Sequence, residues 1–169
     1  MKKAIFMSVI LLALTVTKSF AQDKVVSKGP ELSIGVDGGI PVGDFKEGWK
    51  FGIGGTAKFA YNFDENVAIT LQSGYISFSG KEGISSLGFI PVKVGGRYTF
   101  PGGFFIEPQL GFTSINKGIG TKFTYAGNLG YRMTPGIDVS ARYEGISASG
   151  GNLSFIGFRV AYSFPFGSK

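Results

Sequence analysis

Apolar and polar residues alternate with a period of two along almost the whole chain after about residue 30. This alternation predicts β-strands, because successive side chains of a strand point to opposite faces. The predicted strands are 31–42, 50–63, 66–78, 86–100, 103–115, 120–133, 136–148 and 152–164. They are longer than most strands of globular proteins. Each is long enough to cross a membrane obliquely, which takes about 9–11 residues.

The segments between these strands alternate between tight turns and longer polar loops. The tight turns are 64–66, 101–103 and 134–136, and the loops are 43–49, 79–85, 116–119 and 149–151. Tight turns at one end and longer loops at the other are typical of outer-membrane barrels. The predicted fold class is therefore all-β, an eight-stranded antiparallel up-and-down transmembrane β-barrel.

The two faces of each predicted strand differ sharply in residue type. One face carries almost only bulky apolar residues, as from Phe51 to Phe63, and the other holds nearly all of the strand charges. Eight strands enclose little space, so the bulky face is expected to point outward. An outward face this apolar needs lipid around it. The inverse arrangement, a soluble lipocalin-like barrel with an apolar interior, is the alternative that periodicity alone leaves open.

The polar face predicts a charge network inside the barrel. Its predicted members are Asp37, Lys58, Lys93, Arg97, Glu107, Lys122, Arg132, Asp138, Arg142, Glu144 and Arg159. The acids lie on odd-numbered strands and the bases on even-numbered strands, with Arg142 as the exception. Opposite charges are therefore expected to face each other across neighbouring strands. Such a network would plug the lumen, whereas the surplus of bases leaves open a narrow conduit for small anions.

A Tyr-x-Phe pattern ends the even-numbered strands, with Met133 replacing Phe in one copy. A tyrosine ring can lie in lipid while its hydroxyl stays hydrated, so the pattern predicts an aromatic girdle at one membrane interface. This interface is the periplasmic one if the tight turns are periplasmic. The predicted girdle consists of Tyr61, Phe63, Tyr98, Phe100, Tyr131, Tyr162 and Phe164.

Loop 43–49 contains Phe45 and Trp49, which have two interpretations. They could form an exposed surface for a partner, or a second aromatic belt at the opposite interface. The remaining members of that second belt would be Phe51, Phe89, Phe123 and Phe155.

Residues 1–21 have the features of a cleavable secretory signal peptide. Lys2 and Lys3 precede an apolar run that is too short to span a membrane, and the small residue Ala21 directly precedes the predicted cleavage site. A polar lead-in, 22–30, then precedes the barrel, 31–166. Part of the net charge of +6 lies in the signal peptide, so the charge does not indicate a nucleic-acid partner.

Several stretches resemble small outer-membrane β-barrel proteins of the OmpA/OmpX-like group and porin-like barrels of Bacteroidota-type bacteria. These stretches are "IPVGDF", "GIGGTAKFAYNF", "FIPVKVGGRYTF" and "GFFIEPQLGF", and the resemblance extends over about residues 30–166. It implies a monomer in outer-membrane lipid that is inserted by the barrel-assembly machinery. The chain departs from the group at its end, where Phe166 is followed by Gly167, Ser168 and Lys169 rather than by a terminal aromatic residue.

The chain contains no histidine and no cysteine, which removes the usual general base and the commonest metal ligands. A Ser-Lys pair, Ser79 and Lys81 in one loop, is the remaining formal possibility for catalysis. We therefore expect no enzyme, metal or cofactor. The predicted function is a structural or interaction role of an integral outer-membrane barrel with a polar, salt-bridged lumen. The alternatives are a narrow porin-like conduit for small solutes and a surface adhesin acting through loops 43–49 and 79–85.

Overall fold

The computed structural model describes residues 28–133, 136–148 and 151–166. The predicted signal peptide and most of the polar lead-in lie outside these residues. The elements are β1 (Gly29–Val42), α2 (Phe45–Gly48), β2 (Trp49–Asn62), β3 (Val67–Gly80), β4 (Leu87–Thr99), β5 (Phe104–Ile115), β6 (Gly120–Met133), β7 (Ile137–Ala148) and β8 (Gly151–Pro165). No predicted strand end differs from the observed one by more than two residues.

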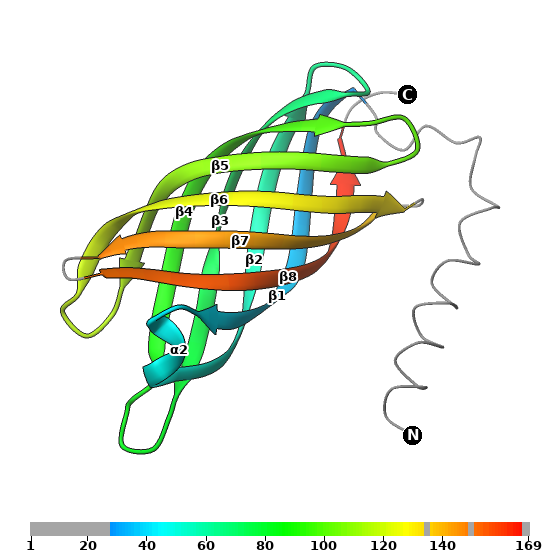
Figure 1. Cartoon of the computed structure of the whole chain (residues 1–169). Coiled ribbons are helices and arrows are strands. Elements are labelled where there is room, and N and C mark those ends of the chain that lie inside the picture. Colours follow the sequence, from blue (N-terminus) through cyan, green and yellow to red (C-terminus); the bar gives the residue numbers. More distant parts are fainter. Residues whose placement is uncertain (1–27, 134–135, 149–150, 167–169) are drawn as a thin grey trace, which may run out of the picture.

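The eight strands form one closed barrel in which every strand pairs with its neighbours in sequence (Figure 1). All pairs are antiparallel, and β1 pairs with β8 from Glu31 opposite Pro165 to Val42 opposite Ser154. The predicted fold class is confirmed. Closure leaves no strand with an unpaired edge, which a lipid environment requires. No helix among the described residues is long and apolar enough to span a membrane.

The barrel has a turn end, where β1 begins and β8 finishes, and a loop end opposite to it. The tight turns 64–66 and 101–103 lie at the turn end, whereas residues 134–135 of the third predicted turn lie outside the described residues. In the β2–β3 turn the side chain of Asp64 accepts hydrogen bonds from the backbone amides of Asn66 and Val67, at 2.7 and 2.8 Å. These bonds favour the ionised carboxylate and lower the pKa of Asp64. In the β4–β5 turn Gly102 and Gly103 have positive φ angles that favour glycine.

The short helix α2 lies at the loop end, between β1 and β2 (Figure 1). Gly43 precedes it with a φ angle of 59°. The sequence did not predict this helix, because four residues are too few to show a helical period.

The outer face of the barrel carries the bulky apolar residues. Phe51, Val94 and Phe158 are each at least half exposed. The charged residues at the alternate positions of the strands point to the opposite face and are buried. The lipocalin-like alternative is therefore wrong, since its bulky residues would fill the interior.

Candidate functional site

The interior of the barrel is filled by side chains in successive layers along its axis. Charged and polar residues fill the turn end and the middle, and apolar residues fill the loop end. Each strand contributes its inward residues to several layers, because it crosses the whole height of the barrel.

The layer at the turn end is organised around Arg132. Its guanidinium donates two hydrogen bonds to Glu31, at 2.8 and 2.9 Å, and two more to Asp138, at 2.7 and 3.0 Å. Two bidentate pairs fix the planar guanidinium between two carboxylates. In the same part of the barrel the guanidinium carbon of Arg97 lies 4.5 Å from the centroid of the Phe105 ring.

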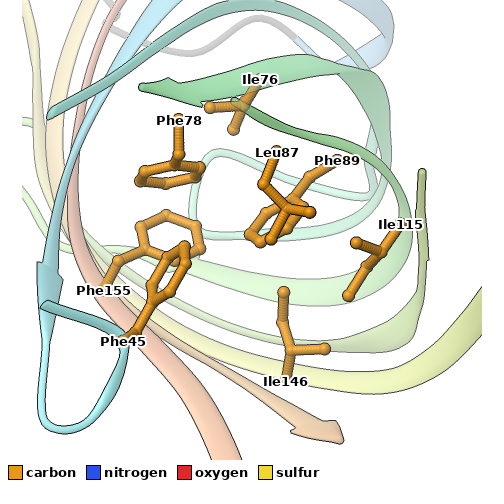
Figure 2. Close-up of a cluster of buried hydrophobic side chains, with 8 residues drawn as sticks. All are labelled: Phe45, Ile76, Phe78, Leu87, Phe89, Ile115, Ile146 and Phe155. Atoms are coloured by element: carbon orange, nitrogen blue, oxygen red, sulfur yellow. The ribbon is translucent and has the colours of Figure 1, made fainter. Parts of the chain in front are cut away.

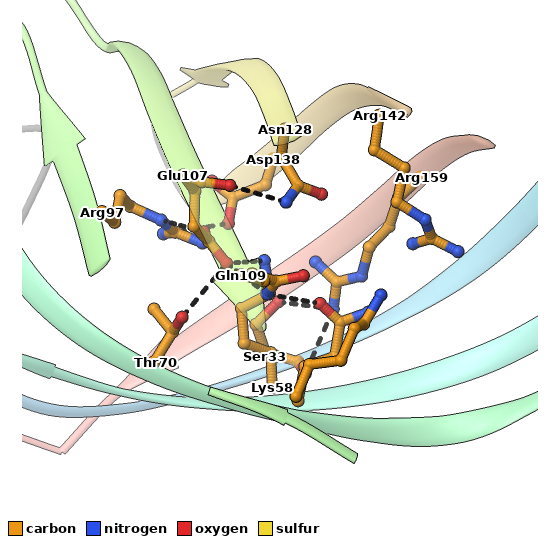
Figure 3. A network of polar contacts seen from close by, with 12 residues as sticks. Ser33, Lys58, Thr70, Arg97, Glu107, Gln109, Asn128, Asp138, Arg142 and Arg159 are labelled. Carbon is orange, nitrogen blue, oxygen red and sulfur yellow. Dashed lines mark hydrogen bonds and ion pairs between the residues drawn. The ribbon is translucent and has the colours of Figure 1, made fainter. Parts of the chain in front are cut away.

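The middle layer is organised around Glu107 (Figure 3). Its carboxylate accepts hydrogen bonds from Lys58 Nζ at 2.8 Å and from Arg97 Nε at 2.7 Å. It also accepts from Thr70 at 3.1 Å and from the amide of Gln109 at 2.6 Å. One carboxylate therefore compensates two cations, and its side chain is fully buried.

The next layer toward the loop end contains two carboxylates that share Arg142. Asp37 accepts from Arg142 Nη1 at 2.5 Å, and Glu144 lies 2.9 Å from Arg142 Nε. Glu144 also accepts from Lys93 at 2.6 Å. Arg159 lies 3.8 Å from Asp37 and donates to the hydroxyls of Ser33 and Thr56. The cations of this layer are thus held by carboxylates and hydroxyls from several strands.

Many of these ion pairs cross the lumen instead of joining neighbouring strands. Lys58 and Glu107 join β2 to β5, and Lys93 and Glu144 join β4 to β7. The pairs Arg97–Glu107 and Arg132–Asp138 join neighbouring strands, as the alternation of acids and bases predicted. The sequence did not predict the pairs across the lumen, since they depend on which inward positions share a level in the closed barrel.

The predicted network residues all lie on inward positions. Lys122 is half-buried nearer the loop end, opposite Thr113 on the neighbouring strand. Glu31 is a network member that the sequence interpretation missed, although it shares its parity with Asp37 and begins the predicted strand 31–42. That shared parity was the signal that could have found it.

A cluster of apolar side chains, here called the mouth cluster, closes the loop end (Figure 2). It consists of Phe45, Ile76, Phe78, Leu87, Phe89, Ile115, Ile146 and Phe155, with Trp49 and Leu153 packed against it. The Phe45 ring lies 5.0 Å from that of Phe78 and 5.8 Å from that of Phe89, measured between centroids.

The mouth cluster corrects the interpretation of the loop-end aromatic residues. Phe45, Phe89 and Phe155 are buried inside the barrel, so their assignment to an exposed surface or a lipid belt is wrong. Only Phe51 and Phe123 of the proposed second belt are exposed on the outer face. The physical reason is parity: the positions of Phe89 and Phe155 point inward, where apolar rings fill space without leaving unpaired charges.

Two glycines of the wall provide the space for the mouth cluster. A Cβ atom at Gly52 would lie 2.6 Å from the Phe78 ring, and one at Gly39 would lie 2.8 Å from it. Both distances are too short for real carbon contacts, so the ring occupies the space that a larger wall residue would take.

Comparison with known proteins agrees with this architecture. Residues 8–164 match the family model described as outer membrane protein beta-barrel domain. The chain belongs to this family. Its members lie in the bacterial outer membrane, so the exposed apolar face of this outer membrane barrel contacts lipid. No curated protein matches the chain.

Solved structures of other outer membrane barrels share the fold. The N-terminal β-barrel domain of Pseudomonas aeruginosa OprF has 15% sequence identity and a TM-score of 0.61, over 82% of this chain and 100% of that one. Ail, the attachment invasion locus protein of Yersinia pestis, has 16% identity and a TM-score of 0.59, also over 82% and 100%. OprG of Pseudomonas aeruginosa has 13% identity and a TM-score of 0.52, over 85% and 99%. At these identities the likeness shows the fold alone.

The Tyr-x-Phe residues of this outer membrane barrel lie on its outer face at the turn end. Tyr61 and Phe63 pack edge to face with 5.4 Å between ring centroids, and the pairs Tyr98–Phe100 and Tyr162–Phe164 do the same at 4.9 and 4.8 Å. On β2, Phe51 and Tyr61 are ten positions apart. At about 3.3 Å per residue and a tilt of roughly 40°, this separation corresponds to about 25 Å, the height of the apolar band of outer-membrane barrels.

Proposed function

We propose that the protein is a sealed, non-conducting and non-catalytic barrel with a structural role in the outer membrane. The observation that carries this proposal is the filled interior. Lys93, Glu107 and Phe78 belong to three successive layers, and each of them is 0% exposed. A water-filled path along the lumen would leave such side chains exposed to solvent.

The barrel reaches the membrane by export followed by assisted insertion. The signal peptide, residues 1–21, directs export, and the barrel-assembly machinery inserts the chain as a monomer. The outward Tyr-x-Phe residues then act as a girdle that sets the depth of the turn end in the bilayer.

The conduit alternative has less support because the bases that would attract anions are occupied. Arg132 is held by Glu31 and Asp138, and Lys58 and Arg97 are held by Glu107. The mouth cluster further blocks the loop end with apolar rings.

The adhesin alternative now rests on loop 79–85 alone. Loop 43–49 buries its Phe45 instead of displaying it, whereas residues 81–86 are all exposed and include Ile84 at 41%. Ail, the attachment invasion locus protein of Yersinia pestis, has the same fold. Replacement of residues 81–86 by a Gly-Ser linker tests this candidate, since a binding activity of the loop would be lost while the barrel stays folded.

Conductance across a planar lipid bilayer tests the sealed-barrel proposal. Refolded protein is first checked on a gel, where a folded barrel migrates differently before and after boiling. We expect no steady current above that of protein-free bilayers. A steady current whose ion selectivity changes in Glu107→Ala would show that ions pass through the lumen and would overturn the proposal. Glu82→Ala, in an exposed loop, is the matched control.

A further inference from the structure

The mouth cluster is built almost entirely from the barrel wall. Phe78, Phe89 and Phe155 come from β3, β4 and β8, and only Phe45 comes from a loop element (Figure 2). Phe45 is 1% exposed, and its ring contacts wall rings and Trp49. The wall therefore forms an aromatic site that the chain fills with one of its own side chains.

The helix α2 is a single turn of four residues, and its buried residues are Phe45 and Gly48. Asp44, the N-cap residue before the helix, makes no side-chain capping hydrogen bond. Gly43 before the helix has a φ angle of 59° and open space around its Cβ position, which makes it a permissive hinge. The backbone oxygen of Gly48 accepts a hydrogen bond from the Lys81 amide at 2.9 Å, which joins α2 to the neighbouring loop.

Two buried N–H donors beside the mouth cluster have no hydrogen-bond partner among the described residues. They are Nε1 of Trp49, which packs against the cluster, and Nη2 of Arg142. Arg142 is 4% exposed, and its guanidinium carbon lies 5.5 Å from the centroid of the Phe155 ring. Unsatisfied buried donors are costly, and an acceptor oxygen brought by a ligand would satisfy one of them.

We propose that the loop end is a binding site for a neutral, single-ring aromatic solute that carries an acceptor oxygen. The solute takes the place of the Phe45 ring when α2 moves outward about Gly43. A neutral solute fits because Arg142 already contacts the carboxylates of Asp37 and Glu144, which would repel an acid. The solute does not cross the barrel, since the charged layers below are filled. This inference goes beyond the sealed-barrel proposal and is compatible with it.

The test uses the refolded barrel in detergent micelles with 4-fluorophenol as the probe. Its binding is followed by ¹⁹F NMR and by the fluorescence of Trp49, the only tryptophan of the chain. We expect saturable binding to the unaltered protein and binding about ten- to hundred-fold tighter to Phe45→Ala, because burying a phenylalanine ring competes with the solute. Phe51→Ala, which removes an outward ring, is the matched control and should leave the affinity unchanged.

A second variant tests whether α2 is the lid. The chain has no cysteine, so Gly48→Cys with Lys81→Cys introduces a single pair at the backbone hydrogen bond between the two loops. Oxidation should abolish binding, and reduction should restore it. Equal binding in both states would overturn the proposed entry route. Absence of saturable binding to the unaltered protein, or binding by Phe45→Ala alone, would overturn the site itself.

Discussion

Removal of the Glu107 charge is the sharpest test of the luminal network. Glu107→Gln keeps the size of the side chain, but it leaves Lys58 and Arg97 buried without the carboxylate that lies 2.8 and 2.7 Å from them. Loss of one partner of a buried ion pair costs about 3–5 kcal/mol in the free energy of unfolding. Because Glu107 compensates two cations, we expect a loss at the upper end of this range.

Removal of the cation Lys58 should destabilise the barrel less than removal of the Glu107 charge. Lys58→Met leaves Glu107 and Arg97 as a pair of equal and opposite charges, so the loss of stability should be clearly smaller than for Glu107→Gln. Combining Glu107→Gln with Lys58→Met leaves one buried cation instead of two, and it should be less destabilising than the sum of the two single changes.

The assay is equilibrium unfolding in urea of barrels refolded in phospholipid vesicles, with Trp49 fluorescence as the signal. Glu82→Gln, in an exposed loop, controls for the loss of one negative charge and should change stability by less than about 0.5 kcal/mol. If Glu107→Gln costs no more than Glu82→Gln or than Lys58→Met, Glu107 is not the charge that balances both cations, and the reasoning is refuted.

Three further experiments test other parts of the barrel. Val94→Arg on the outer face should cost about 2–4 kcal/mol in vesicles, and Tyr98→Arg in the girdle about 0–1, as measured by urea unfolding; equal costs would contradict the assigned depths. Gly52→Val places carbon atoms against the Phe78 ring and should lose about 1–3 kcal/mol and shift Trp49 emission, whereas an unchanged spectrum would argue against a filled mouth. NMR titration of Asp64 should give a pKa below the usual value near 4. The ionised Asp64 carboxylate then contributes to the stability of the fold above about pH 4, and this contribution is lost as the pH falls through the lowered pKa.

The strands and the outward face could be predicted from the sequence because both depend on local rules. Alternation with period two sets the strands, and the bulk of residues such as Phe51 and Val94 decides which face points outward. The acids and bases of the inward face also follow from parity, which places Glu107 and Arg97 in the lumen.

The content of the loop end could not be predicted from residue type alone. Residue type alone predicts a lipid belt for Phe89 and Phe155, because aromatic residues are common there, although each lies on the same face of its strand as an inward base, Lys93 or Arg159. Phe45 lies in a single helical turn, where no periodic pattern exists to indicate its direction. The partners across the lumen depend on strand tilt and on closure, which are properties of the whole barrel.

The ion pairs that cross the lumen have a mechanical consequence. A cylinder of strands joined only along its circumference can flatten to an ellipse while each strand keeps its neighbours. Lys58–Glu107, Lys93–Glu144 and Arg132–Glu31 each join strands three places apart, in different directions across the barrel. Flattening along any of these directions would compress one pair and stretch another. These ion pairs therefore make the barrel resist flattening by the lateral pressure of the bilayer.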